Sequence, residues 1–304
     1  MKPTAACRLL ALWLASLLIV ASSFAAEITD QNLLKPDPGN WVHYSGSYNS
    51  QRHSPLKQIN TSNVGRLQAK WTFQMVGQSH IQAVPIVADG LMYVSQFNRV
   101  DALDARTGNL VWRYQRQPVS TRSQRGTAIH GNMVFVTTDD SRMIALDRRT
   151  GAPIWETKPM GAEYQFAGQA PLVANGKVIM SGNDPFGFIQ AFDVTTGEHL
   201  WTWNAIPKAG EPGSETWAGD SWKLGGGPIW VSGSYDPESN TIFYGTGQPG
   251  SQWAGEVRQG DNLYTESIVA IDLNTGKLKW HFQNTPHDVR DWDSVEMPVL
   301  VDLP

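Results

Sequence analysis

Short runs of apolar residues, each followed by a glycine-containing turn, succeed one another through most of the chain. One eleven-residue pattern occurs four times, with an apolar strand ending in Asp, a Thr-Gly turn and a return strand ending in Trp. Its copies are ALDARTGNLVW, ALDRRTGAPIW, AFDVTTGEHLW and AIDLNTGKLKW, which end at Trp112, Trp155, Trp201 and Trp280. Each copy predicts a β-hairpin, because glycine adopts the positive backbone angle that tight turns require.

A second pair of short strands precedes several of these hairpins. Two apolar runs are found in each of Pro85–Ser95, Pro171–Gly182 and Ile229–Gly247, with Asp-Gly or Asn-Gly between the runs of the first two. Two consecutive hairpins form a four-stranded sheet, and such a unit repeated about every 45 residues is typical of a β-propeller. The sequence therefore predicts an all-β propeller of four-stranded blades.

The recurring tryptophans are interpreted as core residues of this propeller. Large side chains at a fixed repeat position wedge neighbouring sheets together more often than they contact a ligand. The last two repeats lie 79 residues apart, against 43 and 46 for the earlier ones, so an insertion is expected. The segment Trp203–Gly227 is rich in Gly, Pro and Trp without a period, and it is a candidate functional loop.

The first 25 residues differ in composition from the rest. Lys2 and Arg8 flank the start of an apolar run of 13 residues, and small residues follow it. This pattern predicts a signal peptide over residues 1–25, export to the periplasm and a partial propeller domain over residues 26–304. The alternative, a membrane anchor, requires a longer apolar stretch of about 20 residues. No membrane span is expected in the mature chain.

Charge and cysteine content exclude several classes of function. Lys and Arg number 24 against 28 Asp and Glu, so there is no basic field that would hold nucleic acid. The single cysteine, Cys7, lies in the predicted signal peptide. The mature chain is therefore expected to have no disulfide, no thiolate nucleophile and no Cys-ligated metal.

Four segments besides the Trp repeat make the sequence resemble the pyrroloquinoline-quinone (PQQ)-dependent alcohol dehydrogenases, the family of quinoprotein methanol and ethanol dehydrogenases. They are Asn40–Phe73, Gly225–Pro237, Gly260–Asp272 and Thr285–Asp293. The resemblance implies an enzyme that oxidises a small alcohol with PQQ and a Ca²⁺ or lanthanide ion. It also implies a cytochrome c-type electron acceptor and an eight-bladed propeller, of which this chain would be the truncated N-terminal half.

The resemblance also assigns candidate site residues. Trp230 corresponds to the Trp on which the quinone stacks, and Arg125 corresponds to a position at the polar edge of the cofactor. Gln82 stands where the family has an acidic residue that contacts the cofactor. Asp291 corresponds to the catalytic Asp, which takes the hydroxyl proton as hydride moves to the quinone. For Trp230 the alternative is a packing residue, and for Arg125 it is plain surface exposure.

The same resemblance implies a metal site formed by Asp291, Asp293, Gln248 and Asp184. Asp293 matches an additional acidic ligand of the lanthanide-using branch, and two carboxylates at i and i+2 of an extended segment share one face. Gln248 stands where the family has Asn, so its amide oxygen reaches further. Asp184, or Asn183 beside it, is the nearest substitute for the family's liganding Glu in a shortened segment. Solvated turn residues are the alternative.

The sequence departs from the family at the vicinal disulfide that covers the quinone, which would fall near Val119-Ser120. No cysteine occurs there, so the cover of the cofactor must differ. A second class of function is a non-catalytic propeller that acts as a scaffold or interaction module. The acidic run over residues 285–293 and the lack of a lipoprotein cysteine argue against it.

Overall fold

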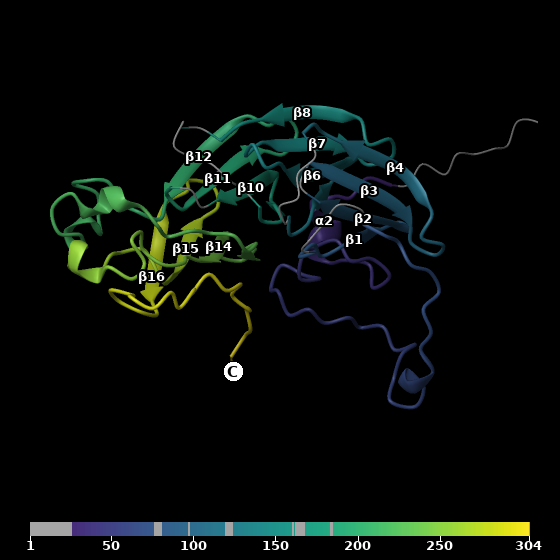
Figure 1. Cartoon of the computed structure of the whole chain (residues 1–304). Helices are drawn as coiled ribbons and strands as arrows, with labels where there is room; N and C mark the ends of the chain where they lie inside the picture. Colours follow the sequence, from purple (N-terminus) through teal and green to yellow (C-terminus); the bar gives the residue numbers. More distant parts are fainter. Residues whose placement is uncertain are drawn as a thin grey trace, which may run out of the picture.

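The computed structural model of the chain describes residues 26–75, 81–96, 98–118, 124–159, 161, 168–182 and 185–303. The predicted signal peptide lies outside the described residues. The described strands form four antiparallel sheets of four strands each. These sheets follow one another along an arc (Figure 1), which confirms the predicted all-β fold built from four-stranded blades.

In each sheet the four strands follow chain order, from an inner strand on the concave side of the arc to an outer strand on its convex side. The first blade consists of β1 (Ile86–Ala88), β2 (Leu91–Gln96), β3 (Arg99–Asp104) and β4 (Leu110–Gln115). The second consists of β5 (Ala128–His130), β6 (Met133–Thr137), β7 (Met143–Asp147) and β8 (Pro153–Thr157). The third consists of β9 (Leu172–Ala174), β10 (Lys177–Gly182), β11 (Phe188–Asp193) and β12 (His199–Asn204). The fourth consists of β13 (Ser234–Asp236), β14 (Thr241–Gly245), β15 (Ser267–Asp272) and β16 (Leu278–Gln283).

The Asp of each repeat holds the Thr-Gly turn that follows it. Oδ1 of Asp104 accepts hydrogen bonds from Oγ1 of Thr107 (3.1 Å) and from the backbone N of Thr107 (2.9 Å) and Arg106 (3.0 Å). These donors, those of Thr107 first, lower the pKa of Asp104. Gly108 closes the turn at φ +73°. The same bonds recur at Asp147, Asp193 and Asp272.

The Ala and the Trp of each repeat face each other across the two outer strands of a blade. Ala102 pairs with Trp112, and the strand register shifts at the next residue, Leu103. The same pair and shift recur at Ala145 and Trp155, Ala191 and Trp201, and Ala270 and Trp280. The repeat thus encodes a small residue opposite a large one and a β-bulge beside them.

Each repeat Trp that has a following blade packs on that blade's turn glycine. A Cβ atom at Gly151 would lie 2.5 Å from Cε3 of Trp112, and the indole Nε1 donates to the carbonyl of Arg148 (3.0 Å). The equivalent close pairs are Trp155 with Gly197 and Trp201 with Gly276. Glycine at the turn therefore serves both the hairpin and the contact between blades.

The prediction that all four repeat tryptophans are core is wrong for Trp280. Trp112 and Trp201 are each 7% exposed, whereas Trp280 is 49% exposed. Trp280 lies on the outer strand of the fourth blade, and no further blade follows among the described residues to set a turn glycine on its ring. Burial of this Trp depends on a neighbouring sheet, which the repeat by itself does not supply.

A fifth Trp of the same kind, Trp71, lies ahead of the first blade in an extended segment. This segment follows the 3₁₀ turn η1 (Val64–Arg66). A Cβ atom at Gly108 would lie 2.5 Å from Cε3 of Trp71, whose Nε1 donates to the carbonyl of Ala105 (3.2 Å). Trp71 thus contacts the first blade as Trp112 contacts the second, although no Thr-Gly repeat precedes it.

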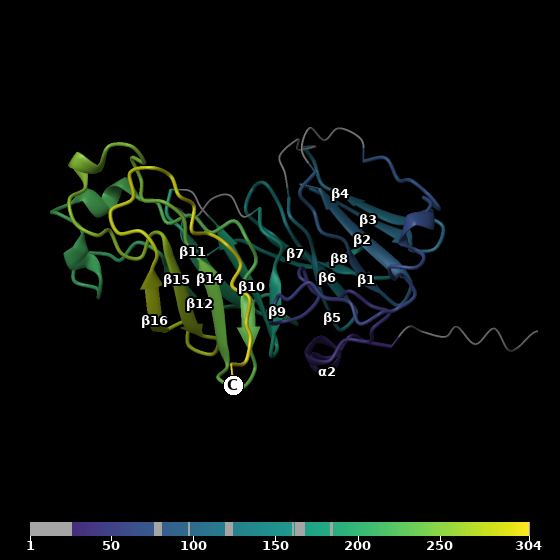
Figure 2. The ribbon, with the colours of Figure 1, turned by 90° about the horizontal axis from the view of Figure 1, so that it is seen from below.

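The N-terminal part of the described chain crosses the concave side of the arc. After the short helix α2 (Asp30–Leu34), Trp41 pairs with Val87 of β1, and the backbone N of Tyr235 in β13 donates to Tyr48 (3.0 Å). Figure 2 shows the C-terminal segment on the same side, alongside β14. The first and fourth blades are therefore linked through the concave side.

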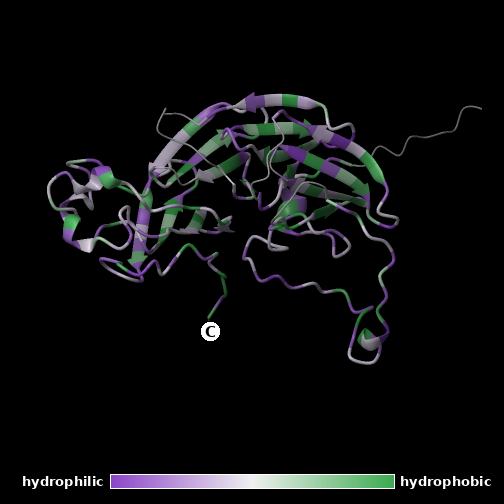
Figure 3. Cartoon of the chain, viewed as in Figure 1, coloured by the Kyte–Doolittle hydropathy of each residue, from purple (hydrophilic) through white to green (hydrophobic). Residues whose placement is uncertain are grey.

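Apolar and polar positions alternate along the sheets (Figure 3). The largest fully buried aromatic side chains are Tyr93, Tyr244, Phe135, Phe188 and Phe192, all on blade strands. The predicted insertion after β12 contains only the 3₁₀ turns η2 (Ser214–Thr216) and η3 (Ser221–Leu224), and η4 (Gly255–Val257) follows later. None of the described helices is long and apolar enough to cross a membrane.

Candidate cofactor and metal site

Trp230 lies four residues before Ser234, where the inner strand β13 of the fourth blade begins, and it packs beside the end of β14. A Cβ atom at Gly247 would lie 3.2 Å from Cη2 and Cζ3 of Trp230. The indole is half-buried, so part of it is accessible to another molecule. Stacking of a flat cofactor on this ring, as the sequence predicts, stays a prediction.

Gln248 directly follows Gly247 and forms part of an open hollow of about 600 Å³. Its backbone carbonyl accepts a hydrogen bond from Gly227 (2.8 Å). Its side-chain Oε1 is buried and has no donor among the described residues. Gln252 and Trp253 line the same hollow. An amide oxygen without a donor, next to an open space, is suited to a hard cation.

The predicted catalytic residue, Asp291, lies in a turn that Asp288 organises. The buried carboxylate of Asp288 accepts hydrogen bonds from the backbone N of Arg290 (2.9 Å), Asp291 (2.9 Å) and Trp292 (3.2 Å). Oδ1 of Asp291 in turn accepts a hydrogen bond from Nε2 of Gln252 (3.0 Å). The structure thus brings Asp291 to a residue that lines the hollow.

The expectation that Asp291 and Asp293 share the face of an extended segment is wrong. Both residues have positive φ, +63° and +57°, because the turn bonded by Asp288 bends the chain there. The two carboxyl groups are nevertheless close enough to interact. Burial first, and then the charges of Asp291, Asp288 and Glu296, raise the pKa of Asp293. Oδ1 of Asp293 is buried without a donor in the described chain.

Sequence reasoning missed Glu266, which is fully buried beside these groups. Its Oε2 accepts a hydrogen bond from the backbone N of Ser294 (2.8 Å), and its Oε1 has no donor among the described residues. Burial, with the charges of Asp288 and Asp293, raises the pKa of Glu266. A single Glu ahead of a strand carries no motif signal, since its surroundings come from distant parts of the chain.

The segments that carry Arg125 and Gln82 meet where Val84, ahead of β1, bonds to the backbone ahead of β5. The backbone N of Val84 donates to the carbonyl of Arg125 (2.8 Å), which brings the segment of Gln82 alongside. Arg125 is half-buried, and burial lowers the pKa of its guanidinium. Gln82 is exposed. No hydrogen bond of the described residues joins either side chain to Trp230, so their shared role with it is untested.

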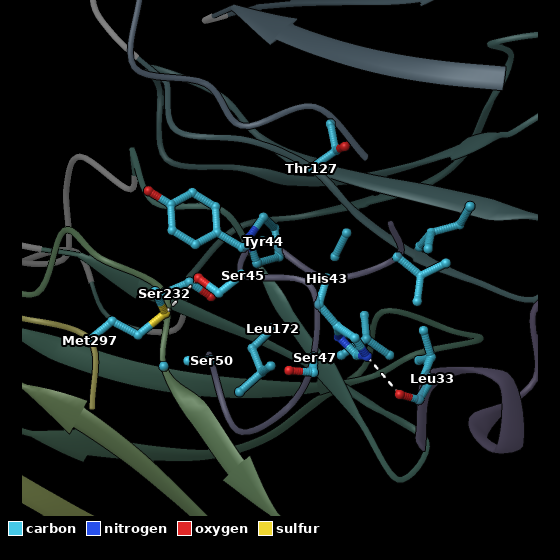
Figure 4. Close-up of a pocket in the computed structure, with 16 residues that line it drawn as sticks. Leu33, His43, Tyr44, Ser45, Ser47, Ser50, Thr127, Leu172, Ser232 and Met297 are labelled. Carbon is cyan, nitrogen blue, oxygen red and sulfur yellow. Dashed lines mark hydrogen bonds between the residues drawn. The ribbon is translucent and has the colours of Figure 1, made fainter. Parts of the chain in front are cut away.

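A small cavity lies on the concave side, where the N-terminal segment meets the inner strands. Tyr44, Thr127, Ser232 and Met297 reach it from four separate parts of the chain (Figure 4). His43 lies beside them, and its Nε2 is 2.7 Å from the carbonyl oxygen of Leu33. A volume of about 20 Å³ holds about one water molecule and no quinone.

Three of the predicted features fall outside the residues that the structure describes. These are the candidate ligand Asp184, its alternative Asn183 and the position near Val119-Ser120. Within the described ranges, no three His, Cys, Asp or Glu side chains gather as a preformed metal centre. The donor-free oxygens of Gln248 and Asp293 still fit a hard cation, because such ions take amide and carboxylate oxygens together.

The four-stranded blades define a β-propeller, and comparison with known proteins identifies its family. Residues 41–304 match the family model of the PQQ glucose/ethanol/alcohol dehydrogenase beta-propeller domain. The chain therefore belongs to the PQQ-dependent alcohol dehydrogenase family.

Individual relatives are similar along nearly the whole chain. Quinoprotein alcohol dehydrogenase PedH of Pseudomonas putida is 37% identical over 93% of this chain and 52% of its own length. A lanthanide-dependent methanol dehydrogenase of Methylacidiphilum fumariolicum is 34% identical over 95% of this chain and 53% of its own. The solved structure of a europium-containing methanol dehydrogenase superposes with a TM-score of 0.82 at 34% identity, covering 90% of this chain and 54% of that one. The chain thus spans about half the length of the curated relatives it matches.

Proposed function

We propose that this propeller belongs to a periplasmic quinoprotein dehydrogenase that oxidises a small alcohol with PQQ and a bound Ca²⁺ or lanthanide ion. The observation that carries the proposal is a pair of buried oxygens without donors, Oε1 of Gln248 and Oδ1 of Asp293. In a chain of this family, such oxygens are most simply explained as ligands for a cation.

Each candidate residue has a role that its chemistry supports. Trp230 would stack under the quinone with its accessible indole, and Arg125 would pair with a carboxylate of the cofactor. Gln248, Asp291 and Asp293 would hold the cation. When bound, the quinone supplies a two-electron acceptor for hydride, and the cation supplies a Lewis acid.

Asp291 is proposed as the base that removes the hydroxyl proton of the alcohol. Its Oδ1 is bonded to Nε2 of Gln252 (3.0 Å), and the backbone bonds of Asp288 fix the turn around it. A carboxylate whose orientation is fixed in this way can meet a hydroxyl group of a substrate in the hollow beside it. The other carboxylate oxygen is then the acceptor of the proton.

The electron acceptor and the location follow from the same proposal. A reduced quinone must be reoxidised, and a cytochrome c-type protein is the acceptor that the sequence predicts. Relatives named quinohemoproteins, such as one of Comamonas testosteroni at 37% identity, support electron transfer through a haem.

Sequencing the N-terminus of the exported protein tests the periplasmic location, since a mature chain that keeps residues 1–25 contradicts cleavage of a signal peptide.

The function is tested on the purified chain supplied with PQQ, a cation and a primary alcohol, with reduction of a dye as the readout. We expect dye reduction that requires both additions, and a loss of about 100-fold or more in Asp291→Asn, because general base catalysis contributes that much. Asp261→Asn, which alters an exposed carboxylate, is the control. Full activity in Asp291→Asn, or none in the parent with every addition, contradicts the proposal.

A further inference from the structure

Glu266 occupies a position that the backbone fixes firmly. Its N donates to the carbonyl of Gly247 (3.0 Å) and its carbonyl accepts from the N of Asn284 (2.7 Å), so it is paired on both sides. The residue is 0% exposed. A carboxylate held there has no access to water, and its location does not depend on a loop that could swing outward.

Only one of the two carboxylate oxygens of Glu266 accepts a hydrogen bond from the described residues. Oε2 accepts the hydrogen bond of Ser294, whereas Oε1 has no donor among the described residues. The charged groups that act on it most, Asp288 and Asp293, are negative like itself. The buried guanidinium of Arg258 binds Oδ1 of Asn262 and the carbonyls of Gln252 and Asp288 instead. Among the described residues, the charged groups that act most on Glu266 therefore include no cation.

Two other donor-free oxygens belong to residues adjacent to the partners of Glu266. Gly247, which accepts from the N of Glu266, precedes Gln248 and its buried Oε1. Ser294, which donates to Oε2, follows Asp293 and its buried Oδ1. Three segments of the chain thus meet at Glu266, and each carries a buried side-chain oxygen without a donor among the described residues. A hard cation is the partner that such a set of oxygens binds.

We propose that Glu266 is a ligand of the metal ion in the proposed dehydrogenase site, together with Gln248 and Asp293. The inference rests on the proposed function in one respect, because it takes that ion to be the metal cofactor of the dehydrogenase. Glu266 then supplies the carboxylate for which the sequence offered Asp184. Coulomb attraction scales with the charge product, so a third carboxylate beside Asp291 and Asp293 strengthens binding of a trivalent ion most.

The inference is tested by titrating the purified chain, without quinone, with Tb³⁺ and recording its Trp-sensitised luminescence. We expect Glu266→Gln to weaken Tb³⁺ binding about 10-fold or more, because loss even of a group that only orients a metal ligand costs about 10- to 100-fold in affinity. Glu296→Gln is the matched control, because it removes the same charge near Asp293 from an exposed position. We expect it to change binding by about threefold or less. Equal affinities of the two variants overturn the inference.

Thermal unfolding with and without Tb³⁺ gives a second readout that does not depend on luminescence. Tb³⁺ should raise the Tm of the parent and of Glu296→Gln more than that of Glu266→Gln, because the stabilisation by a ligand at a given concentration increases with the logarithm of its affinity. Without metal, Glu266→Gln should melt at or above the parent temperature, since it removes a buried charge among like charges. The same Tb³⁺-induced rise in Glu266→Gln as in the parent overturns the inference.

These outcomes separate the metal ligand from the dehydrogenase function. Selective loss of Tb³⁺ binding in Glu266→Gln, with no quinone-dependent alcohol oxidation by the parent, supports the ligand and contradicts the function. Alcohol oxidation by the parent, with unchanged Tb³⁺ binding in Glu266→Gln, supports the function and overturns the ligand.

Discussion

Trp112 of the first blade lies so close to Gly151 of the second that a Cβ atom at Gly151 would approach its Cε3 to 2.5 Å. This contact explains why the repeat ends in Trp and why its turn contains Gly. The Gly is needed for its positive φ, +74°, and for the space under the indole. Contact between blades therefore rests on a residue that has no side chain.

Gly151→Ala is expected to destabilise the chain more than Gly90→Ala. Both glycines have positive φ, but a Cβ atom at Gly90 meets nothing within 4 Å. Backbone strain alone makes Gly90→Ala cost about 1 kcal/mol, whereas displacement of the indole brings Gly151→Ala to about 3 kcal/mol. Denaturant unfolding measures the difference. Equal midpoints would show that the indole moves aside freely.

Trp201→Ala is expected to lower the free energy of unfolding more than Trp280→Ala. Trp201 is 7% exposed and its Nε1 donates to the carbonyl of Leu273 (2.9 Å), while Trp280 is 49% exposed. Truncation of a buried Trp costs about 3–5 kcal/mol, and we expect about 1–2 kcal/mol at the half-exposed one. Denaturant unfolding of both variants measures this. A larger effect at Trp280 would require a partner on its open face.

The blades could be predicted from the sequence because their determinants are local. Asp104 and the turn it bonds lie within three residues of each other, and Ala102 lies opposite Trp112 on the next strand. The same pattern occurs in four repeats, and each repeat predicts the same hairpin. Burial of Trp280 could not be predicted in this way, because it depends on a sheet that the repeat itself does not contain.

The site could be predicted only where a motif names its residues. The resemblance to the family assigns Asp291 to the candidate site, whereas its positive φ accompanies the bonds of Asp288 to the turn, which no motif shows. Glu266 gave no signal, because the group it bonds, Ser294, lies 28 residues further along the chain. Long-range neighbours of this kind are determined by strand pairing and not by spacing in the sequence.

Acidification is expected to destabilise the chain through His43. This histidine is 8% exposed, donates from Nε2 to Leu33 as the neutral ring, and burial lowers its pKa to about 4. An unfolded His binds a proton below about pH 6.5, so between pH 6.5 and 4 the unfolded state binds more protons. The free energy of unfolding therefore decreases by about 3 kcal/mol in all as the pH is lowered from 6.5 to 4.

Urea unfolding at a series of pH values measures this effect of His43. The variant His43→Gln keeps an amide donor for Leu33 and should lose less stability between pH 6.5 and 4 than the parent. Exposed His53→Gln is the control and should follow the parent. Parallel pH profiles for all three proteins would mean that the pKa of His43 is the same in the folded and the unfolded state.

Trp230→Ala is expected to reduce quinone binding by at least about tenfold, because base-sized rings gain about 1–3 kcal/mol from stacking on an aromatic side chain. Absorbance of PQQ that remains with the chain after gel filtration measures it. Trp280→Ala, which alters an indole that is 49% exposed on the outer strand β16, is the control. Unchanged PQQ content in Trp230→Ala would leave this residue with a packing role against Gly247.

Asp293→Ala is expected to shift the metal preference of the chain from a lanthanide toward Ca²⁺. Its Oδ1 is buried without a donor, and the charges of Asp291 and Asp288 act on it, so it adds negative charge to the proposed site. A trivalent ion gains more from that charge than a divalent one.

Competition between La³⁺ and Ca²⁺, followed by calorimetry, measures the ratio of the affinity for La³⁺ to that for Ca²⁺. We expect the parent to prefer La³⁺ and Asp293→Ala to have a smaller ratio. The exposed variant Asp261→Asn should keep the parental ratio. The same ratio in Asp293→Ala would make Asp293 a solvated turn residue, and the preference would then have to come from Glu266 and Asp291.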